Sequence, residues 1–150
     1  MKSIYSAIVF LALIPTAFAQ ESVTMEKRAR EMHRVIGLDD KQQWIKFIKE
    51  NYTQALIDKQ QAMKVQSNEN GNVSTSKEEK NEVDKLEAKA KMFARLHEDF
   101  GGSKIVSIKS KAENLEMVLN NGDGLIGTFK LRFEKTKPYL IDGLAIEAGN

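Results

Sequence analysis

Apolar residues along the first two-thirds of the chain recur at the spacing of an α-helix. In residues 22–36 they fall at i, i+4, i+7 and i+11 and form one stripe: Met25, Ala29, Met32 and Ile36. Gly37 follows the stripe and is suited to end a helix, because glycine adopts the left-handed backbone conformation common at that position. The pattern predicts a first helix over 22–36.

Two further segments follow the same period. A second helix is predicted from Asp40 to about Met63, with Asp40 and Gln43 in capping-box positions. Its wide apolar arc indicates a well-buried element, and it consists of Trp44, Ile45, Phe47, Ile48, Tyr52, Ala55 and Leu56. After a polar loop at 66–76, a third helix is predicted over 77–100, ended by Gly101 and Gly102. Its buried side is expected to hold Val83, Leu86, Ala90, Phe93, Leu96 and Phe100.

Beyond Gly102 the apolar period changes from 3.6 to 2, which is the period of β-strands. Strands are predicted over 105–108, 115–119, 125–134 and 139–148, with a hairpin turn at 120–124. The third is clearest, because Phe129, Leu131 and Phe133 alternate with Thr128, Lys130 and Arg132. Helices followed by an antiparallel meander predict an α+β domain, with the helices on one face of a curved sheet.

The N-terminus has the organisation of a secretory signal peptide. Lys2 precedes a short uncharged apolar run at 4–14, and a small-residue site follows at 17–19. The eleven residues of this run would rise about 16 Å as a helix, roughly half of a bilayer core, so no membrane span is expected. We predict cleavage between Ala19 and Gln20, with 1–19 the signal peptide and 20–150 a single domain, exported to the periplasm or the outside of the cell.

Composition excludes several classes of function. The whole chain has 23 basic and 21 acidic residues, and removal of the signal peptide takes away only Lys2. Such a balance argues against a nucleic-acid partner, which requires a basic face. The absence of cysteine rules out disulfides and thiolate nucleophiles, and two histidines, His33 and His97, cannot form a three-histidine metal site. We therefore predict no metal site and no cofactor.

Two segments carry a resemblance to a known family. Residues 93–102 (FARLHEDFGG) and 138–147 (PYLIDGLAIE), with the strands between them, resemble the ketosteroid-isomerase-like (SnoaL-like, cystatin-like) domain of exported bacterial proteins. The resemblance implies helices packed on a cone-shaped sheet. It also implies an accessory role, because such domains are often fused ahead of a β-lactamase-like serine hydrolase; here the chain stops at Asn150, so the domain is expected to stand alone.

Four residues are candidates for chemistry in a cavity between helices and sheet: Tyr52, His97, Tyr139 and Asp142. Ketosteroid isomerases combine a carboxylate base with hydroxyl and neutral acid donors, which these residue types could supply. Structural roles are the favoured alternatives for two of them. His97 suits a helix C-terminus, where its charge complements the dipole, and Asp142 suits a bulge formed with Gly143.

Two short motifs are interpreted as chance matches. The S-x-x-K pattern at 74–77 lies in a polar loop rather than at the start of a buried helix, unlike the pattern of serine β-lactamases. The glycosylation sequons at Asn51 and Asn72 matter only in a eukaryotic secretory pathway, whereas the family resemblance is bacterial.

A mixed polar and apolar surface is expected on the outer face of the sheet, formed by Val118, Ile126, Thr128, Arg132 and Ile141. Such a surface is typical of a modest interface. We therefore predict a non-catalytic binding or accessory domain, for a small apolar ligand or a secreted protein partner, that forms a homodimer through this face. The alternatives are a cavity enzyme of isomerase or hydratase type, and an inhibitor or immunity-like partner of a secreted enzyme.

Overall fold

The computed structural model describes residues 16–59 and 81–149, with side chains from Glu21 onward. Its elements in chain order are α1 (Thr16–Ile36), α2 (Lys41–Asn51), α3 (Gln54–Asp58), α4 (Glu82–Phe100), β1 (Lys104–Lys111), β2 (Asn114–Asn120), β3 (Ile126–Phe133) and β4 (Ile141–Gly149). The strands form one open antiparallel sheet in the order β1-β2-β3-β4. The predicted α+β arrangement of helices and antiparallel sheet is confirmed.

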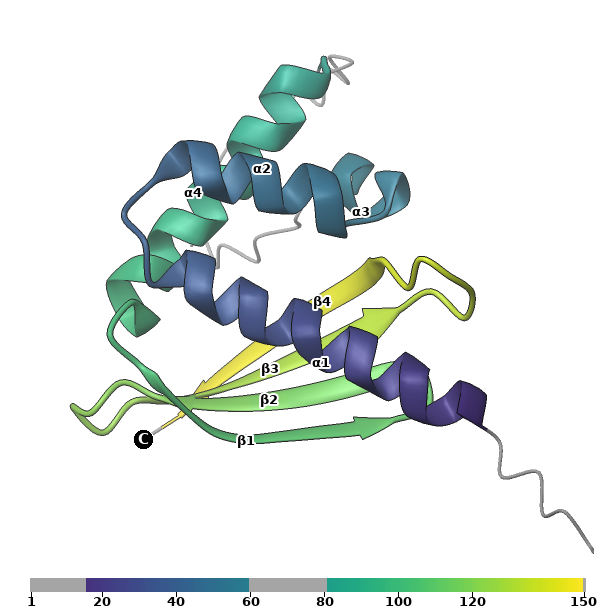
Figure 1. Ribbon diagram of the computed structural model, residues 1–150. Helices are drawn as coiled ribbons and strands as arrows, with labels where there is room; N and C mark the ends of the chain where they lie inside the picture. The colour runs from purple at the N-terminus through teal and green to yellow at the C-terminus, as the bar shows by residue number, and fades with distance from the viewer. Residues whose placement is uncertain (1–15, 60–80, 150) are drawn as a thin grey trace, which may run out of the picture.

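All four helices lie on one side of the sheet (Figure 1). Helix α1 runs across the sheet against β1 and β2, while α2 and α4 pack on each other and on α1. The short α3 contacts α4 and β4. One face of the sheet is therefore covered by helices, and none of the described elements lies over the other face.

The core forms where the inner faces of β2 and β3 meet the helices. Met117 is paired with Phe129 across the two strands, and both are fully buried. The ring of Phe100, from the end of α4, meets Phe129 edge-on with the centroids 5.4 Å apart. A Cβ on Gly127 would lie 2.5 Å from the Phe100 ring, so this strand position requires glycine. The predicted inward register of the third strand is confirmed.

The predicted second helix is wrong in its length, because the helix breaks at Tyr52. Tyr52 has extended backbone and forms a bridge with Ile141 of β4, and the Thr53 N–H donates to the Ile141 carbonyl at 2.9 Å. The Thr53 hydroxyl then accepts from the Leu56 N–H and starts α3. A contact with a strand far along the chain interrupts the helix, and the predicted end at Met63 lies outside the described residues.

The beginning of α4 also differs from the prediction. Asn81 is the N-cap, and its side chain accepts from the Asp84 N–H at 2.9 Å. Val83, expected on the buried side, is 66% exposed. The first turn of α4 extends past α2, the helix on which α4 packs (Figure 1). The predicted residues 77–80 of this helix and the polar loop at 66–76 lie outside the described residues.

Candidate functional site

The four candidates for cavity chemistry lie in separate surroundings. No hydrogen bond, ion pair or ring contact joins any two of Tyr52, His97, Tyr139 and Asp142 within 16–59 and 81–149. The side chain of Tyr52 lies in the core against Phe47 and Phe93, with ring centroids 6.1 and 6.5 Å away. Its hydroxyl is buried and has no hydrogen-bond partner among the described residues, and this burial raises the pKa of the phenol.

The two histidines lie in the last turns of α1 and α4 and donate hydrogen bonds to backbone carbonyls of other segments. His97, in the last turn of α4, donates from Nδ1 to the Ile36 carbonyl at 2.8 Å, and its ring packs against Trp44. His33, in the last turn of α1, donates from Nε2 to the Ser103 carbonyl at 3.0 Å. Both rings thus have a structural role as hydrogen-bond donors to backbone carbonyls. The position of His97 in the last turn of α4 is the one expected from its place in the sequence.

Asp142 occupies the bulge that its position beside Gly143 predicted. The register of β3 and β4 shifts there, since Arg132 pairs with Gly143 while Phe133 pairs with Ile141. The Asp142 carboxylate forms an ion pair with Arg132 at 2.8 Å and accepts from the Thr53 hydroxyl at 3.4 Å. Its oxygens therefore hold the bulge and the α2–α3 break together.

Tyr139 lies in the turn between β3 and β4. Its φ is 55°, in the left-handed region, and its N–H donates to the Thr136 carbonyl at 2.9 Å. The carbonyl of the neighbouring Pro138 accepts a hydrogen bond at 2.9 Å from Arg28 of α1. The second acceptor of the Arg28 guanidinium is Oδ1 of Asn51, at the end of α2.

Asn51 also bears on the first glycosylation sequon. Its side chain is 8% exposed, with Oδ1 bonded to Arg28 and Nδ2 donating to the Phe47 carbonyl at 2.9 Å. An amide held at both ends inside the fold offers no free nitrogen for a glycan, which agrees with the interpretation of this motif as a chance match. The S-x-x-K pattern at 74–77 and the sequon at Asn72 lie outside the described residues.

The outer sheet face, defined by Val106, Val118, Ile126, Thr128, Lys130 and Arg132, is the surface opposite the helices. Val118 pairs with Thr128 across β2 and β3, and Ile126 is 42% exposed. Val106 is 62% exposed at the bulge between Ile105 and Ser107 in β1. The alternation of residues does not predict Val106 at this face, because the bulge breaks the strict period of 2.

Ile141 does not belong to this face, and its predicted place there is wrong. It is fully buried on the helix side, opposite Phe133. Simple alternation along β4 predicts the outer side for Ile141. The bulge at Asp142 and Gly143 adds one residue to the strand, so the residues before it face the opposite side from the one that alternation predicts. The other predicted members, Val118, Ile126, Thr128 and Arg132, are partly or largely exposed.

Both signs of charge accompany the apolar positions of the outer sheet face. Lys130 and Glu147 form an ion pair at 2.7 Å between β3 and β4, and this hydrogen bond raises the pKa of the lysine. Glu116 pairs with Lys130 on one side and with Lys109 on the other in the strand register. The face is therefore a mosaic of lysine, glutamate and aliphatic side chains rather than a single-sign surface.

Within the described ranges 16–59 and 81–149, no group of histidine and carboxylate side chains could hold a metal ion. None of the helices in this part combines the length and apolar character that crossing a membrane requires. Comparison of the chain with protein-family models, with curated proteins and with solved structures finds no match.

Proposed function

We propose that the protein is an exported, non-catalytic binding domain whose outer sheet face holds a protein partner, and that this partner is a second copy of the chain. The observation that carries the proposal is the uncovered apolar surface of the sheet. Val106 and Ile126 are 62% and 42% exposed, and none of the described elements lies over them. Exposed aliphatic side chains grouped on one side of a sheet are typical of an interface.

The charge pattern favours a second copy over an unrelated partner. In a two-fold dimer the same patch lies on both sides, so the patch must be self-complementary. A face that carries Lys109 and Lys130 beside Glu116 and Glu147 can meet this condition, because a rotated copy can bring opposite charges together. A face of one sign would repel its copy.

The alternative of a cavity enzyme finds less support. A general base must be within reach of its proton, and the oxyanion donors must converge on the same reacting atoms. Here His97 and Asp142 already serve backbone and side-chain partners of the fold, and Tyr52 lies in the core among aromatic rings. The proposal keeps the expected export, with cleavage between Ala19 and Gln20, and the accessory role that the ketosteroid-isomerase-like resemblance implies.

Sedimentation velocity of the mature protein tests the proposal. We expect a concentration-dependent dimer at high micromolar concentration, and we expect Ile126→Asp to shift it to monomer, because the interface would bury a carboxylate without a partner. Val83→Asp is the matched control, since Val83 is 66% exposed but lies on α4. A monomer at all concentrations, or equal effects of the two variants, would overturn the proposal.

A further inference from the structure

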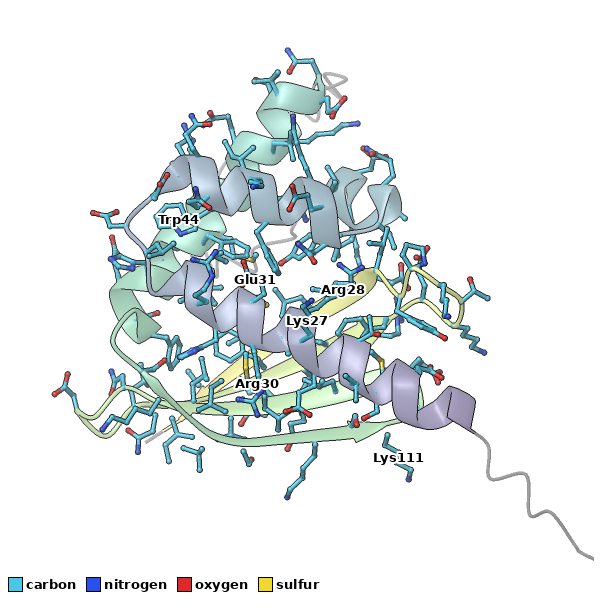
Figure 2. All side chains as sticks on the ribbon, in the orientation of Figure 1. Lys27, Arg28, Arg30, Glu31, Trp44 and Lys111 are labelled. Atoms are coloured by element: carbon cyan, nitrogen blue, oxygen red, sulfur yellow. The ribbon has the colours of Figure 1, made fainter. Side chains whose placement is uncertain are left out.

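A second surface with the properties of a binding site lies on the helical side of the molecule. A cleft of about 270 Å³ opens between α1 and α2, and its lining includes Arg28, Glu31, Arg34, Lys46, Glu50 and Asn51. Figure 2 shows Arg28 and Glu31 on the side of α1 toward α2, with Arg30 on the other side. The volume is near the lower bound of roughly 300 Å³ for small-molecule sites. This α1–α2 cleft shares no residue with the outer sheet face.

One acidic and one basic group in the cleft are already paired. Arg34 donates to Glu31 from Nε at 2.9 Å and from a terminal nitrogen at 2.7 Å. This hydrogen bonding, with the positive charges of Arg34, Lys27 and Lys46, holds the pKa of Glu31 below its usual value. Glu31 is therefore ionised and neutralised, and it adds no free negative charge to the cleft.

Arg28 contributes positive charge and forms no ion pair within 16–59 and 81–149. Burial lowers the pKa of its guanidinium, and the negative charge of Glu134 raises it. The terminal nitrogens of Arg28 donate to two neutral oxygens, Oδ1 of Asn51 and the carbonyl of Pro138. Its Nε is buried without a partner among the described residues. The two neutral contacts fix the guanidinium in place, so little side-chain entropy would be lost when an anion binds to it.

The opposite wall of the cleft supplies one further cation and one anion. Lys46 and Glu50 lie one turn apart on α2, and neither takes part in an ion pair within 16–59 and 81–149. The lining also includes the buried apolar side chains Val35 and Phe47. Two cations and one carboxylate thus border a small, largely polar space, and none of the three forms an ion pair among the described residues.

We propose that the α1–α2 cleft binds a small amino dicarboxylate, a molecule with two carboxylates and one ammonium group. Arg28 and Lys46 hold the carboxylates, and Glu50 accepts from the ammonium. The charges of such a ligand match, one for one, the three cleft side chains that form no ion pair among the described residues. A simple dianion would leave Glu50 facing negative charge, and a phosphate would fill only part of the volume.

Titrations followed by amide nitrogen–proton NMR spectra of the mature protein test this proposal, with glutamate as the probe. Glutarate has the same carboxylates without the ammonium group, and inorganic phosphate is the non-carboxylate anion. We expect saturable shifts at α1 and α2 with glutamate, and binding of glutarate and phosphate at least about fivefold weaker. The ordering reflects a charge-assisted hydrogen bond to Glu50. Equal affinities for the three probes would overturn the proposal.

Variants at exposed lysines of the same helix locate the site. Lys46→Gln is expected to weaken glutamate binding about fivefold or more. Lys49→Gln changes a lysine of the same helix that lies outside the cleft lining, so it should weaken binding less than about twofold. Glu50→Gln should remove the preference for glutamate over glutarate. Equal losses from the two lysine variants, or no saturation with glutamate, would overturn the proposal. The outcome is independent of dimer formation, because the two surfaces share no residue.

Discussion

The two faces of the sheet obey different physical rules, although the same strands supply both. Along β3, Phe129 and Leu131 point toward the helices and are almost completely buried, while Lys130 and Arg132, which alternate with them, are exposed. The inner positions are fixed by shape, since rings and aliphatic groups from α4 and β2 fill the space around them. None of the described helices or strands packs on the outer positions, so their shape is not constrained in this way. Substitution should therefore affect folding on the inner face and association on the outer face.

The largest effect should come from the centre of the inner face. Phe129 is fully buried between Met117 of β2 and the ring of Phe100. Phe129→Ala should lower the free energy of unfolding by about 3–5 kcal/mol, because the lost burial is joined by the cost of the cavity left behind. Chemical denaturation measures this change. Lys130→Ala, the next residue on the opposite face, should cost far less, and comparable losses for both would contradict the assigned register.

A second test of the inner face adds atoms instead of removing them. A Cβ at position 127 would lie 2.5 Å from the Phe100 ring. Gly127→Ala should therefore destabilise the fold by about 1–3 kcal/mol through overpacking, although alanine normally favours folding relative to glycine. Gly102→Ala is the control, since no atom lies within 4 Å of its added Cβ. Thermal unfolding of the pair should separate them, and equal midpoints would show that α4 does not press on β3.

The Arg28 contacts that join the helical layer to the β3–β4 turn should contribute less to the free energy of unfolding than the core does, but the contribution should be measurable. Arg28→Gln removes the contacts with Asn51 and the Pro138 carbonyl, leaving a buried amide oxygen unpaired. We expect a loss of about 1–3 kcal/mol in urea unfolding. Arg30→Gln is matched to it, because within the described part of the chain the Arg30 side chain bonds only to Glu26, one turn away on an exposed surface. An equally small loss in both variants would show that Arg28 does not link the two layers.

Local periodicity predicted much of the fold but none of these links. The stripes of α1 and α4 and the alternation of β3 follow from neighbouring residues, so they can be read from a single segment. The helix break at Tyr52 and Thr53, by contrast, depends on a hydrogen bond to Ile141, almost ninety positions later. The α1–α2 cleft depends on Arg28 meeting Asn51 and the turn at Pro138, and periodicity carries no signal for such contacts.

The same distinction explains the mixed outcome for the candidate residues. Asp142 beside Gly143 was interpreted as a bulge, and the local sequence was enough because a glycine next to a short polar residue favours irregular backbone. The consequence for Ile141 was missed, because a bulge changes the face of every residue on one side of it. The face of a strand residue therefore depends on where its bulges lie as well as on its own type.

The smallest expected effect concerns the Tyr52 hydroxyl, a polar group buried in the core between the helices and the sheet. The Tyr52 hydroxyl is buried and unbonded within 16–59 and 81–149. Tyr52→Phe removes this atom and keeps the ring that packs on Phe47 and Phe93. We expect stability at neutral pH to be unchanged or raised by about 1 kcal/mol or less, because a buried hydroxyl without a partner costs free energy.

The pH dependence gives this last variant its sharper measurement. Burial raises the pKa of Tyr52 in the folded chain above the ordinary value of 10.0, so the folded state favours the protonated phenol. Its contribution to stability is fully present below pH 10.0 and is lost as the pH rises from there toward the folded-state pKa. Unfolding free energies measured above pH 10.0 should therefore fall less steeply with pH in Tyr52→Phe than in the unmodified protein. Tyr139→Phe is the control, because Tyr139 lies half-buried in the β3–β4 turn. Parallel alkaline slopes for Tyr52→Phe and the unmodified protein would place the Tyr52 hydroxyl in contact with water, and would show that the helix-covered layer is open at this point.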